Sequence, residues 1–382
     1  MSDRPFNSSS PRVLLVTEGF GANFFGVARV VRDLLVMVRS NRLSGLVAAL
    51  VIRDVLHEDR EFVVSMPYWI WTRTLRFHVR QLPSMRGLLA SFRPSVVHVH
   101  GVLSPLQALT VHCAARRNIP TILSVHGMLE PWLWRQSGVF YYGMKRLYWR
   151  LVMRPSLSQV TCLHAITQQE ADTLAREFPG IPQVLIPNAI HIDEYSEQQS
   201  APVQERTLLF VGRLHPKKGV DLLMRSMAGT HSRAYRLQLV GSGKPDYTDY
   251  LKSLVNELGL ADRVTFLGGV FGEEKIRLMR DAWTVVVPSY SDVVALVNLE
   301  AAACFTPTIT TTMTGLTDWS ESGGLLINPE RSELTAAIDQ VLAWSLADRL
   351  ERGRRSREFV NSRYSWDVVG KLWLDTYRKY SA

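Results

Sequence analysis

The sequence predicts an α/β protein made of two doubly wound, Rossmann-like domains in tandem. Short β-branched runs alternate with segments of helical period over almost all of the 382 residues, which is typical of βαβ units and parallel sheets. The polar segment 195–206 has no helical period, interrupts this alternation and precedes a clear new strand. The length also fits two or three domains of about 150 residues, each able to bury a core.

The predicted strands fall into two sets separated by amphipathic helices. Apolar residues recur at i, i+3 and i+4 over 27–38 and again over 251–258. A last amphipathic helix, 366–382, carries large aromatic side chains and is expected to cross back to the first domain. Strands are expected at 12–16, 96–99, 121–125 and 184–186 in the first domain, and at 207–211, 236–240, 263–267, 284–287 and 325–327 in the second.

The two domains are predicted to span 1–197, with helix 366–382 docked on it, and 198–365. Their sheets are expected to face a central cleft at the carboxyl ends of the strands, because ligands of this fold class bind there.

The composition excludes several classes of protein. With 46% hydrophobic and 21% charged residues, the chain is neither disordered nor fibrous. Cys113, Cys162 and Cys304 are widely spaced, which argues against a disulfide framework or a structural zinc site. The N-terminus has no apolar core of a secretory signal, and no run of about 18 apolar residues predicts a spanning helix. A cytoplasmic location is therefore expected.

The positive charge is concentrated in the first half of the chain. Residues 1–197 carry 21 basic and 14 acidic side chains, whereas 198–382 carry 23 and 21. The stretches 68–93 and 131–154 contain no acid and mix basic with aromatic residues, which favours an anionic membrane surface and a peripheral position at the inner face of the plasma membrane. The equally weighted alternative places the aromatic residues in the core and the arginines in solvent. Nucleic acid is not expected, because no recognised binding module accompanies the charge.

Two strand ends in the second half carry candidate binding residues. The segment GRLHPKKG places Arg213 and Lys218 between a strand and a helix N-terminus, an arrangement that binds anions. The segment LVGSG places Gly241 and Gly243 before another helix. It lacks the full GxGxxG of dinucleotide binders, which argues against an NAD-dependent oxidoreductase.

A third strand end carries two carboxylates. The segment VVVPSYSDVVALVNLE places Asp292 in a loop and Glu300 in the following helix, where both can face the cleft. Glu300 lies among apolar residues and therefore needs a partner, since an unpaired buried charge is costly; the alternative is a surface pair. His98 and His100 share one face of a strand, but the pattern offers no third ligand, so no metal site is predicted.

The order of these motifs resembles that of glycosyltransferase family 4, whose members have the GT-B fold and use nucleotide sugars. The second half contains, in order, GRL followed by PKKG, LVGSG, PSYSD with a glutamate eight residues later, TGL and GGLLINP. The first half contains FFGVARVVRDLL, VVHVHG, SVHGMLEPW and IPNAIHID. The resemblance extends over about 12–373.

The resemblance implies a retaining, metal-independent hexosyltransferase without a cofactor. The co-substrate would be a UDP- or GDP-linked sugar, bound by the second domain. The acceptor would be a saccharide or a lipid-linked saccharide of bacterial surface polysaccharide or lipopolysaccharide biosynthesis, bound by the first domain.

The resemblance also assigns roles to individual residues. Arg213 and Lys218 would hold the donor diphosphate, and Glu300 the ribose hydroxyls. Asp292, at the family's first acidic position, would lie near the donor sugar, as would His126, for which a purely structural role is the alternative. Backbone would approach the donor at Gly26, Gly241, Gly243, Val293, Val294, Ala295 and Leu296.

The chain departs from the family pattern next to Asp292. Many members have a glutamate followed by glycines there, whereas this chain has aspartate followed by Val293, Val294 and Ala295. Aspartate is shorter, and valine resists a positive φ. A non-catalytic saccharide- or lipid-binding protein with a degenerate donor site is therefore the alternative function.

Overall fold

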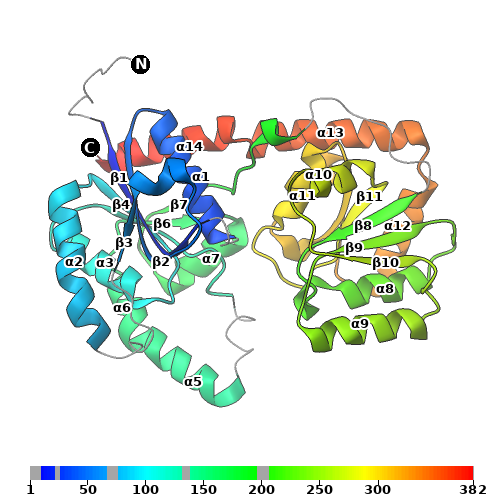
Figure 1. Ribbon diagram of the computed structural model, residues 1–382, viewed down its shortest axis with the longest axis horizontal. Helices are drawn as coiled ribbons and strands as arrows, with labels where there is room; N and C mark the ends of the chain where they lie inside the picture. The colour runs from blue at the N-terminus through cyan, green and yellow to red at the C-terminus, as the bar shows by residue number, and fades with distance from the viewer. Residues whose placement is uncertain (1–9, 22–25, 67–75, 131–137, 196–205, 382) are drawn as a thin grey trace. The chain divides into compact units, whose positions relative to one another are not determined.

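The computed structural model describes residues 10–21, 26–66, 76–130, 138–195 and 206–381, which form two compact units (Figure 1). The first comprises Met1–Pro187 and Gly370–Ala382, and the second Asn188–Val369. The division falls after Pro187, whereas the sequence places it after residue 197. Outside the described residues lie 196–205 of the predicted linker and 68–75 and 131–137 of the two basic aromatic stretches.

The first unit is built on a parallel, doubly wound sheet. Its strand order is β3-β2-β1-β4-β5-β6-β7, so the direction of winding reverses between β1 and β4. The strands are β1 (Arg12–Phe20), β2 (Ser44–Ile52), β3 (Val63–Ser65), β4 (Val96–His100), β5 (Thr121–Ser124), β6 (Cys162–Ala165) and β7 (Gln183–Leu185). The helices are α1 (Val27–Ser40), α2 (Arg76–Phe92), α3 (Pro105–Ala115), α5 (Gly138–Tyr148), the π-helical turn η2 (Trp149–Met153), α6 (Arg154–Leu157) and α7 (Gln168–Glu177), with a 3-10 turn η1 (His57–Phe62).

The second unit is a smaller sheet of the same kind. Its strand order is β10-β9-β8-β11-β12-β13, all parallel, with the reversal between β8 and β11. The strands are β8 (Thr207–Val211), β9 (Arg236–Val240), β10 (Val264–Gly268), β11 (Thr284–Val287), β12 (Thr308–Thr311) and β13 (Leu325–Ile327). The helices are α8 (Val220–Ala228), α9 (Pro245–Glu257), α10 (Gly272–Asp281), α11 (Leu296–Ala303), α12 (Arg331–Ala343) and α13 (Leu346–Tyr364), with 3-10 turns η3 (Ile192–Glu194), η4 (Pro216–Lys218), η5 (Thr312–Thr314) and η6 (Trp319–Ser322). The last helix, α14 (Trp366–Ser381), begins in the second unit and belongs to the first from Gly370 onward.

These elements confirm the predicted fold class and every predicted strand. Strands β2, β3, β6 and β12 are absent from the sequence prediction. The predicted C-terminal helix is α14, whose last part packs on the first unit. Within the described residues, no helix is long and apolar enough to span a membrane.

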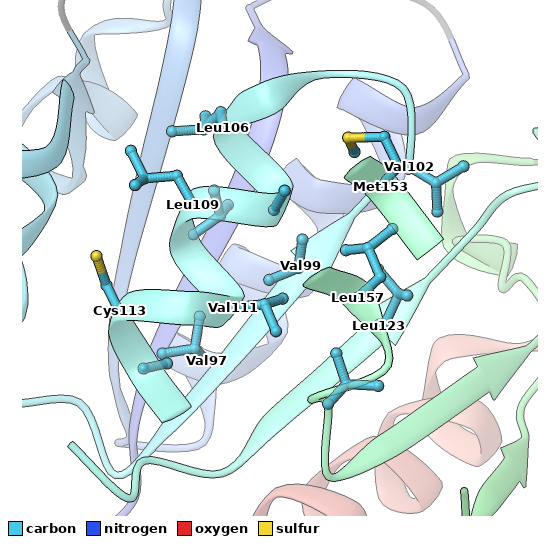
Figure 2. Close-up of a cluster of buried hydrophobic side chains, with 14 of the residues drawn as sticks. Val97, Val99, Val102, Leu106, Leu109, Val111, Cys113, Leu123, Met153 and Leu157 are labelled. Atoms are coloured by element: carbon cyan, nitrogen blue, oxygen red, sulfur yellow. The ribbon is translucent and has the colours of Figure 1, made fainter. Parts of the chain in front are cut away.

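Strand β4 is buried on both faces, and its two faces differ in chemistry. Successive side chains of a strand alternate, so Val97 and Val99 point to one side and His98 and His100 to the other. Figure 2 shows the valines facing α3 in an apolar cluster. On the other side, the rings of Trp373 and Tyr377 of α14 pack against His98.

A chain of hydrogen bonds crosses the histidine side of the sheet. Tyr377 Oη lies 2.8 Å from His98 Nδ1, and His98 Nε2 lies 2.7 Å from Ser124 Oγ. Ser124 Oγ lies 2.6 Å from His164 Nδ1, and His164 Nε2 lies 2.8 Å from the carbonyl oxygen of Ile186. Because that carbonyl only accepts, neutral rings give the chain one direction: each group donates to the next, from Tyr377 to Ile186. The network therefore ties α14 to β4, β5 and β6.

This network predicts that acid destabilises the first unit. Burial lowers the pKa of His98 and His100 well below the ordinary value and that of His164 to about 4. The unfolded chain takes up these protons near pH 6.5 and the folded chain does not, so stability is lost as the pH falls from about 6.5 towards 4. The expected loss is up to about 1.4 kcal/mol per pH unit for each histidine.

Urea unfolding at a series of pH values between about 7 and 5 measures this dependence. His164→Gln removes one titrating group and should make the free energy of unfolding less dependent on pH. An identical pH dependence in the variant and the wild type would contradict the assignment.

Candidate functional site

Ten of the twelve predicted site residues lie in the second unit, on or near the loops that follow β8, β9 and β11. Strands β8 and β11 flank the point where the winding reverses. In open α/β sheets, ligands bind outside the carboxyl ends of the strands at such a point. Arg213 and Lys218 follow β8, Gly241 and Gly243 follow β9, and Asp292 follows β11.

Glycines let these loops approach one another closely. A Cβ on Gly241, whose φ is +142°, would lie 1.8 Å from the carbonyl oxygen of Gly212. A Cβ on Gly243 would lie 2.2 Å from the carbonyl oxygen of Leu214. The backbone N–H of Leu214 also donates to the carbonyl of Ser242 at 2.9 Å. The two predicted glycines are therefore required by contact between the β8 and β9 loops.

Lys218 and Asp292 meet across the point of reversal. Lys218 Nζ lies 2.5 Å from Asp292 Oδ2, and Lys217 Nζ lies 3.7 Å from Asp292 Oδ1. Ser289 donates a third bond to Asp292 Oδ2 at 2.9 Å. The carboxylate thus holds both lysines at the carboxyl edge, with the side chains of all three only partly exposed.

Further cations surround the same edge. Partial burial and the charges of Arg213, Lys217, Lys244 and Lys218 lower the pKa of His215 below its ordinary value. The imidazole is therefore neutral at pH 7, and its Nδ1 accepts a hydrogen bond from the backbone N–H of Lys217 at 3.3 Å. We call Arg213, Lys217, Lys218 and Lys244 the β8–β9 cation cluster. Their combined positive electrostatic potential favours the binding of a polyanion.

The segment after Asp292 leads into α11. Val293 and Val294 form a partly exposed loop, Ala295 is the N-cap, and Leu296 begins the helix. No side chain caps this end. The N–H of Leu296 donates to the carbonyl oxygen of Val294 at 3.0 Å, and the N–H of Asn298 donates to the carbonyl oxygen of Ala295 at 2.9 Å. The positive end of the helix dipole lies at this loop and favours an anionic ligand.

Glu300 is buried in α11 and its partner lies on α10. Lys275 Nζ donates to Glu300 Oε1 at 2.8 Å, and the glutamate is only 6% exposed. The sequence therefore identified correctly that this carboxylate needs a partner. In the described contacts, Lys218 forms an ion pair with Asp292, whereas Glu300 forms its ion pair with Lys275 of α10.

The remaining two predicted residues, Gly26 and His126, lie in the first unit. Gly26 is the N-cap of α1, and its φ of +71° suits a residue without Cβ. His126 follows β5 with a φ of +52°, unusual for a residue other than glycine. Its Nε2 lies 3.0 Å from Nδ1 of the buried His100, and desolvation lowers its pKa to about 3.

Several site residues were missed by reasoning from the sequence. Glu170 of α7 accepts from the backbone N–H of Gly127 at 2.6 Å and so holds the turn that carries His126. Lys275 pairs with Glu300, and Ser289 donates to Asp292. The charge of Lys244 helps to lower the pKa of His215 beside the predicted site. Lys217 was visible as the first lysine of PKKG, directly beside the predicted Lys218.

Two family models match consecutive parts of the chain. Residues 25–189 match the glycosyl transferase 4-like domain, and residues 191–358 match the glycosyl transferases group 1. The uncharacterized glycosyltransferase MJ1607 of Methanocaldococcus jannaschii is 26% identical over 82% of each chain. A D-inositol 3-phosphate glycosyltransferase of Stackebrandtia nassauensis is 29% identical over 78% of this chain and 66% of that protein.

Solved structures share the fold over nearly the whole chain. Sucrose-phosphate synthase of Thermosynechococcus elongatus has a TM-score of 0.76 at 21% identity, covering 97% of this chain and 98% of its own. HepE of Anabaena in complex with UDP-glucose has a TM-score of 0.73 at 17% identity, covering 97% and 100%. WaaG, a glycosyltransferase involved in lipopolysaccharide biosynthesis, has a TM-score of 0.70 at 17% identity, covering 96% and 99%. With matching family models on both halves and this fold throughout, the chain belongs to the group 1 glycosyl transferases and has the GT-B fold.

Proposed function

We propose that this glycosyltransferase moves a hexose-type sugar from a nucleoside diphosphate donor to a saccharide or a lipid-linked saccharide. The observation that carries the proposal is the β8–β9 cation cluster beside Lys218 and Asp292. A diphosphate is a compact polyanion, and this edge of the sheet offers it several cations and the positive end of a helix dipole. The donor is UDP- or GDP-linked; the UDP-glucose complex of the Anabaena protein supports the UDP form.

The reaction proposed is transfer with retention through departure and attack on the same face of the sugar. The bond from the anomeric carbon to the diphosphate breaks, the acceptor oxygen bonds to that carbon, and the acceptor proton passes to the departing phosphate oxygen. A double displacement needs a carboxylate close under the anomeric carbon. Asp292 is held instead by Lys217, Lys218 and Ser289, which favours the same-face route.

Charge develops on the departing diphosphate, and Arg213 and Lys218 are proposed to stabilise it there. Because cationic side chains supply this charge, the proposed transfer is independent of a metal ion and of any cofactor. Asp292 orients Lys218 and lies near the donor sugar. Glu300 accepts from the ribose hydroxyls, and His126 lies near the transferred sugar.

Backbone groups complete the proposed donor site. Gly241 and Gly243 allow close approach, and the N–H groups of the segment Val293, Val294, Ala295 and Leu296 bind sugar or phosphate oxygens. Gly26 gives the equivalent access in the first unit. The acceptor and pathway proposed are those of bacterial surface polysaccharide or lipopolysaccharide biosynthesis, which the likeness to WaaG supports. The enzyme would act at the inner face of the plasma membrane.

Lys218→Ala should lower kcat/KM strongly, because the ammonium acts where charge develops. Removing one such donor costs about 2–4 kcal/mol of transition-state stabilisation, which corresponds to a roughly 30- to 1000-fold loss. Lys252→Ala, an exposed lysine of α9, is the matched control and should retain activity. Turnover of the Lys218 variant at the wild-type rate would contradict the assignment.

Glu300→Gln should raise KM for the donor more than it lowers kcat, because the carboxylate is proposed to bind ribose in both ground and transition states. Lys275→Ala breaks the same ion pair but retains the carboxylate. It therefore distinguishes a loss of donor binding from a loss of stability. Both variants should unfold at lower temperature, but only the Glu300 variant should lose donor affinity. Equal donor KM in the two variants would make Glu300 a purely structural residue.

Calorimetry with UDP- and GDP-sugars tests the function as a whole. Binding of one donor, followed by mass spectrometry of the product formed on a lipid-linked saccharide, is the expected outcome. Absence of affinity for any nucleotide sugar would favour the alternative, a non-catalytic saccharide- or lipid-binding protein.

A further inference from the structure

An apolar face of α5 and η2 is exposed in the first unit. Met144, Leu147, Tyr148 and Leu151 follow the i, i+3, i+4, i+7 pattern that normally faces a core, yet Leu147 is 59% exposed and Leu151 is 68% exposed. The side of the same segment that packs on the core carries Trp149 and Met153 instead. The segment therefore has two apolar faces, one of them in solvent.

Basic residues flank this exposed face. Lys145, Arg146 and Arg150 are exposed on the same segment, and no acidic residue occurs anywhere between residues 131 and 154. An apolar stripe with arginine and lysine on its flanks matches a layer with hydrocarbon below and negative headgroups above. In Figure 1, α5 lies at the periphery of the first unit.

An apolar pocket opens beside the same segment. Its volume is about 150 Å³, and it is lined by Val102 and Leu103 after β4, Met128 after β5, and Trp149 and Met153 of η2. Lys145 and Tyr148 also line it, so the pocket combines an apolar wall with one ammonium group. A volume of about 150 Å³ is large enough for a benzene-sized hydrocarbon.

We propose that the exposed face of α5 and η2 docks on an anionic lipid bilayer and that the adjacent pocket receives a hydrocarbon segment of a membrane lipid. The charge of the flanks selects the bilayer over a neutral partner, and the pocket gives one lipid chain a defined place at the carboxyl ends of β4 and β5. Docking on the bilayer and the hydrocarbon pocket do not depend on the proposed function. A further role of the bound lipid as the sugar acceptor rests on that function.

Sedimentation with vesicles tests the docking. Wild-type protein should bind vesicles of phosphatidylcholine and phosphatidylglycerol, bind pure phosphatidylcholine weakly, and lose affinity as salt rises from about 0.1 to 0.5 M. The double variants Leu147→Ser with Leu151→Ser, and Arg146→Gln with Arg150→Gln, should each bind at least about tenfold more weakly. Because the four side chains are exposed, folding should be unaffected.

Leu346→Ser, at an exposed leucine of the second unit, is the control and should bind vesicles as the wild type does. Equal vesicle binding by wild type and both double variants would overturn the docking surface. A dimer that forms without lipid and buries the exposed face of α5, detected by sedimentation velocity, would also overturn the docking surface.

Photo-crosslinking tests the pocket. A phosphatidylglycerol with a diazirine at the end of one acyl chain should label Met128, Trp149 or Met153, and Leu103→Trp should reduce this labelling by filling the pocket. Labelling confined to Leu147 and Leu151 would overturn the hydrocarbon site. Donor binding, measured on the same variants by calorimetry, should be unchanged; its absence in all of them would refute the proposed function and leave the lipid result standing.

Discussion

The contact between the loops after β8 and β11 determines the chemistry of the second unit. At Gly219, whose φ is +66°, a Cβ would lie 2.0 Å from the carbonyl oxygen of Pro288. The N–H of Tyr290 also donates to the carbonyl of Lys217 at 2.8 Å. The loops that follow the paired strands β8 and β11 are thereby held together, and Lys218 reaches Asp292. Any side chain at Gly219 would separate them, so the missing Cβ is needed for the contact between Lys218 and Asp292.

In the first unit, a chain of hydrogen bonds beside β4 has a comparable role. A strand buried on both faces usually carries apolar residues throughout. Strand β4 instead carries histidines on the side that faces α14. His98 is hydrogen-bonded to Tyr377 and Ser124. From Ser124 the chain of bonds continues to His164 of β6, which bonds to a backbone carbonyl. A directional chain of bonds specifies where α14 packs, which apolar contacts alone would define less sharply. The same burial keeps the rings neutral.

The basic residues of the chain serve distinct purposes in the two units. In the second unit, the β8–β9 cation cluster lies at a sheet edge, and two of its lysines pair with one aspartate. In the first, exposed arginines flank an apolar helix face. The net charge of +9 therefore does not by itself indicate nucleic acid binding.

The sequence by itself determined the fold class, most strands and the loops that carry Arg213, Lys218 and Asp292, because strand ends and glycines leave local signals. It missed β2, a continuous apolar run without alternation, and short strands such as β12, since their pairing comes from distant neighbours. Only the tertiary structure decided that Lys275 pairs with Glu300 and that α5 exposes an apolar face. Burial and ion pairing are properties of segments far apart in the chain, and no local pattern encodes which segments meet.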